Sequence, residues 1–376
     1  MRNPLYPKIS ILFFFGLIIG VNIASSLQHS ILVQNFHVTL FLGLSTQTNK
    51  YQGHLGNSKY LFQQNDGSNS FFIVGNENFS ASAMSNGWIG TGTLEYPIRI
   101  SEEKIEEIII KDTTLHFKIS NCQVNGSSKD GIILRNVSNC QISKNNILKN
   151  WIHGSNTGNG VSLEDSKNIS IIQNSIIGNN NGIFLRNSKY NIISGNGIIN
   201  NVNGIRLEYS DYNSIQNNNI SHNGMSGIIL SNSLSNHVSR NIISQNDHYG
   251  LQVFKSGENI INDNNISDIP AVGINLFNSV NCLLTRNMII NTRGIQITYS
   301  PYCFFSRNWV KNSENLIGII FTSSDHSQIT NNSISNTSGS GIILESSNYC
   351  LVENNRASNN ILNGISILDS DKNMII

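Results

Sequence analysis

A repeat of about 22 residues runs through most of the chain and constrains its fold more than any other feature. A glycine followed by an aliphatic residue recurs at spacings of 29, 22, 22, 23, 23, 23, 21, 24, 23 and 23 residues. The eleven anchor glycines are Gly131, Gly160, Gly182, Gly204, Gly227, Gly250, Gly273, Gly294, Gly318, Gly341 and Gly364. A position is counted here as the number of residues after the anchor glycine, and a column is one position taken through successive repeats. Such self-similarity indicates a stacked repeat architecture.

The apolar residues of each repeat form units of strand length. Positions 1 and 3 are apolar in every repeat, as at Ile205 and Leu207, and position 11 is apolar in the ten complete repeats, as at Ile215. Units this short are too small for helices, and the period leaves room for about three short strands and three tight turns. Leucine-rich repeats have a similar period, but their longer Leu/Asn consensus is absent. We therefore predict an all-β fold, a right-handed single-stranded parallel β-helix of about ten to twelve coils with 21–24-residue repeats.

Asparagine fills one column completely. Position 14 is Asn in all ten complete repeats, although Asn is unfavourable inside helices and strands. The column comprises Asn145, Asn174, Asn196, Asn218, Asn241, Asn264, Asn287, Asn308, Asn332 and Asn355. Stacked coils would place these amides one above another as a hydrogen-bonded ladder. Asn also tolerates the left-handed backbone of a sharp corner, so we expect it at the corner itself.

The five cysteines also follow the repeat. Cys140, Cys282, Cys303 and Cys350 lie at position 9, where other repeats carry Asn, and "KISNCQV" aligns Cys122 with Cys140 in "NVSNCQI". This predicts one inward column of small, weakly polar residues. Disulfides between neighbouring coils and a metal–thiolate site are the alternatives to free thiols.

The N-terminus has the pattern of an export signal. Arg2 and Lys8 precede the apolar run "ISILFFFGLIIGVNI", which is followed by the small residues Ala24, Ser25 and Ser26. We assign residues 1–26 to a signal peptide, with an uncleaved membrane anchor as the alternative. Residues 27–84 form an N-terminal segment that is expected to cap the helix, and residues 85–376 form the β-helix with an incomplete last coil. The predicted location is extracytoplasmic: secreted, periplasmic or at the cell surface.

The coil consensus resembles that of a known family. The segments "NGIRLEYSDYNSIQNNNI", "GWIGTGTLEYPIRI" and "IIIKDTTLHFKISNCQVNG" are similar to the NosD-like periplasmic copper-binding proteins, which are related in fold to pectate lyases. The resemblance implies a pectin-lyase-like solenoid and raises the question of copper. His and Met are the expected copper ligands, but the histidines of the repeats share no column. We predict no cofactor, with Ca²⁺ or Cu as weaker alternatives.

Charge is scarce and is gathered in one place. Only 12% of residues are charged and the net charge is +1, so a nucleic-acid partner is excluded. Position 4 alternates in sign through Arg135, Glu164, Arg186 and Glu208. The catalytic candidates are Glu164, Arg186, Arg206 and Glu208, and the binding candidates are Trp151, His153, Asp165, Asp211, Tyr190 and Tyr212. Trp151 and His153 belong to the insertion of the one long repeat. The alternative is an ordered surface of ion pairs and turn-shielding tyrosines.

These features favour a non-catalytic scaffold of the cell surface or envelope that contacts carbohydrate. The first alternative is a polysaccharide lyase, hydrolase or epimerase, and the second is a copper-related accessory protein. A lyase would need clustered carboxylates for Ca²⁺ with a projecting base, and a hydrolase would need close acidic pairs; neither pattern is present. The expected partners are a polysaccharide or envelope glycan, a membrane only through the N-terminal signal or anchor, and further copies joined end to end.

Overall fold

A computed structural model describes residues 70–376 apart from 127–128, 151–157 and 314–316. The predicted signal peptide and most of the 27–84 segment therefore lie outside the described residues. No helix in the described part of the chain has the length and hydropathy of a membrane span.

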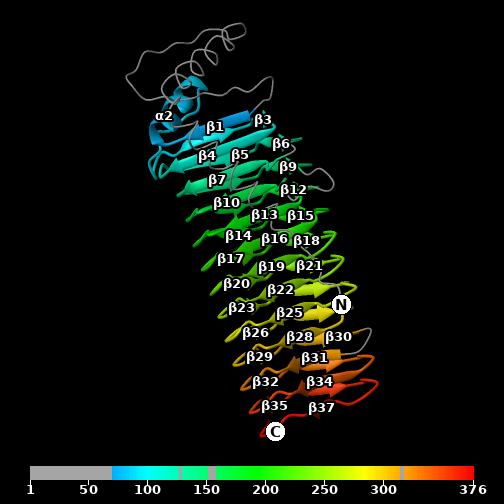
Figure 1. The fold of residues 1–376 in the computed structure, drawn as a ribbon. Helices are drawn as coiled ribbons and strands as arrows, with labels where there is room; N and C mark the ends of the chain where they lie inside the picture. The colour runs from blue at the N-terminus through cyan, green and yellow to red at the C-terminus, as the bar shows by residue number, and fades with distance from the viewer. Residues whose placement is uncertain (1–69, 127–128, 151–157, 314–316) are drawn as a thin grey trace, which may run out of the picture. The chain divides into compact units, whose positions relative to one another are not determined.

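The described residues form three parallel sheets, and each coil before the last contributes one strand to each of them (Figure 1). Sheet A contains β1 (Ser70–Val74), β4 (Glu107–Thr113), β7 (Ile132–Val137), β10 (Val161–Glu164), β13 (Asn181–Arg186), β16 (Asn203–Glu208), β19 (Ile228–Ser231), β22 (Leu251–Phe254), β25 (Ile274–Phe277), β28 (Ile295–Thr298), β31 (Ile317–Thr322), β34 (Ser340–Glu345) and β37 (Ile365–Leu368). Sheet B contains β2 (Ile98–Ser101), β5 (Phe117–Ser120), β8 (Cys140–Ser143), β11 (Ser170–Ile172), β14 (Ile192–Ser194), β17 (Ser214–Gln216), β20 (His237–Ser239), β23 (Ile260–Asn262), β26 (Leu283–Thr285), β29 (Phe304–Ser306), β32 (Gln328–Thr330), β35 (Leu351–Glu353) and β38 (Met374–Ile375). Sheet C contains β3 (Lys104–Ile105), β6 (Gln123–Asn125), β9 (Asn146–Leu148), β12 (Ser175–Ile177), β15 (Gly197–Ile199), β18 (Asn219–Ser221), β21 (Ile242–Ser244), β24 (Asn265–Ser267), β27 (Met288–Ile290), β30 (Trp309–Lys311), β33 (Ser333–Ser335) and β36 (Arg356–Ser358).

The aliphatic columns fill the inside of the coils. In the coil that starts at Gly204, Ile205, Leu207, Ile215 and Ile220 are fully buried. Each pairs in register with an aliphatic residue of the next coil, as Ile205 does with Ile228. The predicted parallel β-helix and its repeat length are confirmed, since apolar residues at alternate positions of short strands can be buried only by stacking coils.

A strand and a helix cover the N-terminal end of this stack. β1 extends sheet A beyond β4, so the sheet begins at Ser70, before the predicted boundary at residue 85. The helix α2 (Asn76–Ser85) buries Phe79, whose ring meets that of Phe117 edge-on at 4.8 Å between centroids. These elements shield core side chains that an uncovered first coil would expose.

Most corners of the coils are built from a left-handed residue followed by a buried polar one. In the Gly204 coil the left-handed residues are Tyr209, Tyr212, Asn217 and His222, with φ between 51° and 58°. The residues that follow them are Ser210, Asn213, Asn218 and Asn223, and all four are buried. Each of these side-chain oxygens accepts the backbone N–H of its counterpart in the preceding coil, at 2.9–3.0 Å.

The position-14 ladder is confirmed. Each Asn side-chain amide from Asn145 to Asn332 donates to the Oδ1 of the next member at 2.9–3.0 Å. Our expectation that these Asn residues adopt the left-handed conformation is wrong, because position 13 takes it, as at Asn217 and Arg240. A second ladder at position 19 joins Asn150, Asn179, Asn201, Asn223 and Asn246. The sequence shows this column, but we did not predict it.

The anchor glycines are needed for close approach and, with the exception of Gly294, not for an unusual φ. A Cβ at Gly204 would lie 2.3 Å from the carbonyl oxygen of Gly227 and 2.6 Å from Cγ2 of Ile220. The unusual dihedrals fall instead on corner residues with side chains.

Candidate functional site

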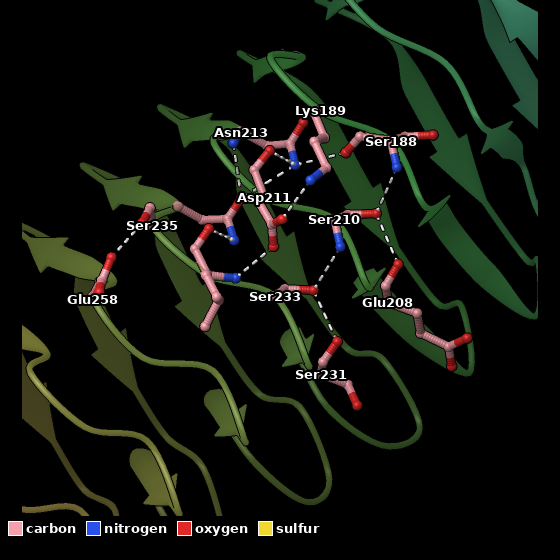
Figure 2. Close-up of polar contacts among 12 residues, drawn as sticks. Ser188, Lys189, Glu208, Ser210, Asp211, Asn213, Ser231, Ser233, Ser235 and Glu258 are labelled. Atoms are coloured by element: carbon pink, nitrogen blue, oxygen red, sulfur yellow. Dashed lines mark hydrogen bonds and ion pairs between the residues drawn. The ribbon is translucent and has the colours of Figure 1, made fainter.

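The candidate site lies along the corner that links sheets A and B. Positions 4 to 9 form this corner, and the left-handed residues at positions 5 and 8 turn their side chains away from the buried serine and asparagine columns. Figure 2 shows the serine column, with Ser210 joined to Ser188 and Ser233, and the charged side chains beside it. The corner therefore fixes the spacing of every outward side chain to that of neighbouring parallel strands, about 4.8 Å.

The structure brings the four charged residues of position 4 together in the predicted order. Glu164 on β10 lies in register between Arg135 and Arg186, and Arg186 on β13 lies beside Glu208 on β16. Lys111 extends the column by one coil, since it pairs in register with Arg135. We missed Lys111 because its coil has no anchor glycine.

The carboxylates of this column are engaged by arginines. Arg135 Nε lies 2.5 Å from Glu164 Oε2, and Arg186 Nη2 lies 3.1 Å from Glu208 Oε2. Arg206, two residues before Glu208 on the same strand, donates through Nε and Nη2 to Glu208 Oε1 at 2.9 and 2.5 Å. Each oxygen of the Glu208 carboxylate therefore already accepts a hydrogen bond from a guanidinium group.

The binding candidates on the adjacent turn also form pairs. Lys189 Nζ lies 2.8 Å from Asp211 Oδ2, and this hydrogen bond raises the pKa of the exposed Lys189 ammonium. Tyr190 and Tyr212 stack with ring centroids 5.3 Å apart and an interplanar angle of 9°. Asp165 is exposed at a left-handed corner with φ of 50°. Trp151 and His153 lie outside the described residues.

A second group of stacked rings lies further along the same corner. Tyr302, His326 and Tyr349 occupy position 8 of three successive coils, with centroid distances of 5.0 and 4.9 Å and nearly parallel planes. Lys372 in the next coil donates to the Tyr349 hydroxyl at 2.7 Å. This stack is compatible with our prediction that no two histidines of the repeats share a column. That prediction overlooked that His326 lies in the same column as the tyrosines.

Phenylalanine replaces charge at position 4 in the middle of the helix. Phe254 and Phe277 stack at 5.7 Å, and Phe277 meets Tyr299 edge-on at 5.7 Å. Tyr299 and its counterpart Tyr209 are both more than half exposed at position 5. Counting from the anchor glycines would have found all four residues, which our search for charged columns passed over.

The cysteines are free thiols in the described chain, and one of them was assigned to the wrong column. Cys140 pairs in register with Phe117, whereas the backbone N–H of Cys122 donates to Asn145 Oδ1 at 2.9 Å. Cys122 therefore heads the position-14 ladder, because the shared Ser-Asn-Cys-Gln motif lies between sheets B and C at Cys122 and between sheets A and B at Cys140. Burial raises the pKa of Cys140, and the Cys282 thiol together with burial raises that of Cys303. Such thiols are poor nucleophiles and poor metal ligands.

Metal-ligating side chains are not clustered. Over residues 70–376, outside the three undescribed segments, no group of three or more His, Cys, Asp or Glu side chains could hold a metal ion. Most of the insertion and of the N-terminal segment lies outside the described residues, so copper and Ca²⁺ binding stay predictions.

Comparisons with known proteins agree with this fold. The family model described as "Right handed beta helix region" matches residues 107–265, and the model described as "Periplasmic copper-binding protein (NosD)" matches residues 255–376. No curated protein matches the chain. The two family matches together with the coil geometry confirm the resemblance to NosD-like right-handed β-helix proteins.

Several solved structures share the architecture. PfbA, a surface adhesin of Streptococcus pneumoniae, is similar with a TM-score of 0.54 and 13% identity over 72% of this chain and 82% of the adhesin. A double mutant of the periplasmic alginate epimerase AlgG gives 0.53 and 15% identity over 81% and 84% of the two chains. The Dettilon tailspike protein gives 0.52 and 14% identity over 77% of this chain and 63% of the tailspike. At such identities these likenesses concern the fold alone.

Proposed function

We propose that this protein is an exported, non-catalytic β-helix scaffold that contacts carbohydrate through the corner between sheets A and B. The observation that carries the proposal is the row of exposed aromatic and hydrogen-bonding side chains, repeated at strand spacing on a rigid frame. Aromatic residues with a polar edge suit ligands that offer both C–H faces and hydroxyl groups. The adhesin and tailspike architectures support the proposal by analogy only.

Export is part of the same proposal. The apolar run of residues 9–23 behind Arg2 and Lys8 has the form of a signal segment, and the matched NosD model describes a periplasmic protein. Detection of the mature chain in the periplasm or at the cell surface tests this part. A chain found only in the cytoplasm would contradict it.

The enzyme alternative remains, centred on Glu164, Arg186, Arg206 and Glu208. The similar fold of an alginate epimerase favours it, whereas the Arg–carboxylate pairing of both glutamates weighs against a free general base. Glu164 and Glu208 lie on either side of the coil that carries Arg186, so their carboxylates are about 10 Å apart. This separation is at the wide end of the range that inverting hydrolases use.

A polysaccharide panel separates these alternatives. The full chain is incubated with acidic and neutral polysaccharides, with and without Ca²⁺, while binding and product release are both measured. Binding without products supports the scaffold. Turnover that disappears in Arg206→Ala but persists in Arg356→Ala, an exposed arginine of sheet C, would establish the enzyme. A copper titration followed by calorimetry tests the third alternative.

The proposed end-to-end association concerns the last coil. Sedimentation of the full chain tests the idea, and a single species at the monomer mass over a wide concentration range would count against it.

A further inference from the structure

We infer that the part of the corner between Tyr212 and Tyr302 binds a neutral glycan lying along the stacking direction of the coils. The inference rests on the proposed function and names both the surface and the kind of glycan. We call this surface the aromatic field, and it consists of Leu234, Phe254, Phe277, Val280, Tyr299 and Tyr302.

The aromatic field is a bounded change in the composition of two columns. Position 4 carries charge up to Glu208 and then, after Ser231, carries Phe254 and Phe277. Position 7 carries Lys189 and Asp211 and then Leu234, Gly257, Val280 and Pro301, before charge returns at Asp325. Leu234, Phe277 and Val280 are 44%, 37% and 39% exposed, which is unusual for neighbouring apolar side chains on a soluble surface.

Tyrosine rings stand at both ends of this stretch. Tyr212 stacks on Tyr190 toward the N-terminal coils, and Tyr302 stacks on His326 toward the C-terminal coils. Between them, position 8 carries only Ser235, Glu258 and Asn281, which are not aromatic. The two tyrosines are four coils apart, or about 19 Å at the usual strand spacing. A ring face at each end is therefore left without an aromatic neighbour among the described residues, while the stretch between carries apolar and hydroxyl-binding groups side by side.

Polar groups for hydroxyl recognition accompany the apolar ones. Ser235 Oγ donates to Glu258 Oε2 at 2.9 Å, as Figure 2 shows, and Asn281 is exposed in a neighbouring coil. Carboxylate and amide groups beside apolar surface match a sugar ring, which has hydroxyls at its edge and C–H groups on its faces.

The charges favour a neutral ligand. Beside the field, Glu258 and the Lys255 ammonium, which lies 5.1 Å from the centre of the Phe254 ring, carry opposite signs. Asp211 and Asp325 at the borders are both acidic. A uronate chain would find a single cation, Lys255, for its repeated carboxylates and would meet three acidic side chains.

The repetition of the surface favours a polymer over a protein partner. Stacked coils present similar groups at a constant interval of about 4.8 Å, so a ligand that also repeats can satisfy successive coils in the same way. Each additional sugar unit that contacts a coil adds contact area without a further association step. We therefore expect affinity to grow with the length of the glycan.

The test measures binding of neutral cello-, manno- and chito-oligosaccharides of increasing length, with alginate oligomers as the acidic counterpart, to the full chain by calorimetry. We expect one neutral series to bind, with affinity that rises with length and levels off once the chain spans the two tyrosines. The double variant Phe277→Ala/Tyr302→Ala is expected to bind at least about tenfold more weakly, since two ring contacts are lost. Two control variants, Trp309→Ala for an exposed ring on sheet C and Arg356→Ala for an exposed arginine of the same sheet, should bind within twofold of the unchanged chain.

Each other outcome overturns a defined statement. Binding of alginate oligomers only, or loss of binding in Arg186→Ala but not in the double variant, refutes the aromatic field and leaves the carbohydrate function standing. Self-association that the double variant abolishes, with no glycan bound, identifies a protein interface instead. If no member of the panel binds a chain whose circular dichroism shows it to be folded, both the inference and the proposed function fail.

Discussion

Replacing one rung of the position-14 ladder tests the physical basis of the fold. Asn218 is 1% exposed, and its side chain uses all four of its hydrogen-bonding positions, two donors and two acceptors. Its oxygen accepts from the backbone and side-chain nitrogens of Asn196 at 3.0 and 2.9 Å, and its two N–H groups are shared among Ile193 O, Gln216 O and Asn241 Oδ1 at 2.9–3.0 Å. At about 1 kcal/mol net each, Asn218→Leu loses about 4 kcal/mol. Burial of the leucine side chain offsets about 2 kcal/mol, which leaves a predicted loss of about 2 kcal/mol in the free energy of unfolding.

The matched control is Asn219→Leu. Asn219 is the next residue, lies on the exposed face of β18, and makes no side-chain hydrogen bond within the described chain. Equilibrium denaturation followed by circular dichroism compares both variants with the unchanged chain. We expect a clear shift of the unfolding midpoint for Asn218→Leu and almost none for Asn219→Leu. Equal midpoints for the two variants would refute the view that the buried amide ladder stabilises the coils.

Three further predictions concern packing, thiols and pH. Gly204→Ala should lower the free energy of unfolding by about 1–3 kcal/mol, because the new methyl group overlaps the backbone of the next coil. Gly224→Ala is the control, since its Cβ would meet nothing closer than 4.0 Å, and it should be nearly neutral in the same denaturation assay. Native protein should resist alkylation of Cys140 and Cys303 at neutral pH, because both thiols have raised pKa values, Cys140 through burial and Cys303 through its contact with Cys282 together with burial. Mass spectrometry should show both modified only after denaturation, and rapid labelling of the native protein would contradict their buried placement. Desolvation raises the pKa of Glu107 above its ordinary value of 4.5. The contribution of Glu107 to stability is therefore present below pH 4.5 and is lost as the pH rises through the folded-state pKa. Glu107→Gln should flatten this part of the curve of stability against pH, and an unchanged curve would exclude Glu107 as its source.

The alternating charges of the candidate site show what can be predicted by counting positions in the repeat. Once the repeat is known, the order Arg135, Glu164, Arg186 and Glu208 follows from counting, and the observed register reproduces it. Counting could not show that Arg206 turns toward Glu208 within its own strand, because that contact depends on side-chain conformation. This contact makes the charged column look more like a self-paired surface than a catalytic one.

The cysteines show where counting fails. Cys122 and Cys140 share a local motif, yet the motif lies between sheets B and C at Cys122 and between sheets A and B at Cys140, so Cys122 stands at the head of the asparagine ladder. Local similarity does not reveal a change in register, since strand pairing is decided by which inward side chains meet across coils.

The sequence by itself determined the architecture, the number of strands per coil, the buried aliphatic columns and the position-14 ladder. It could do so because short apolar units repeated at one period have few ways to be buried other than by stacking. Only the tertiary structure decided which residues take the left-handed corners, why the anchors are glycine, and which aromatic side chains meet. Those features depend on distances between coils, such as the 2.3 Å approach at Gly204 and the ring contacts of Tyr302, His326 and Tyr349. A column predicts that such residues are neighbours, and the packed coils decide how they touch.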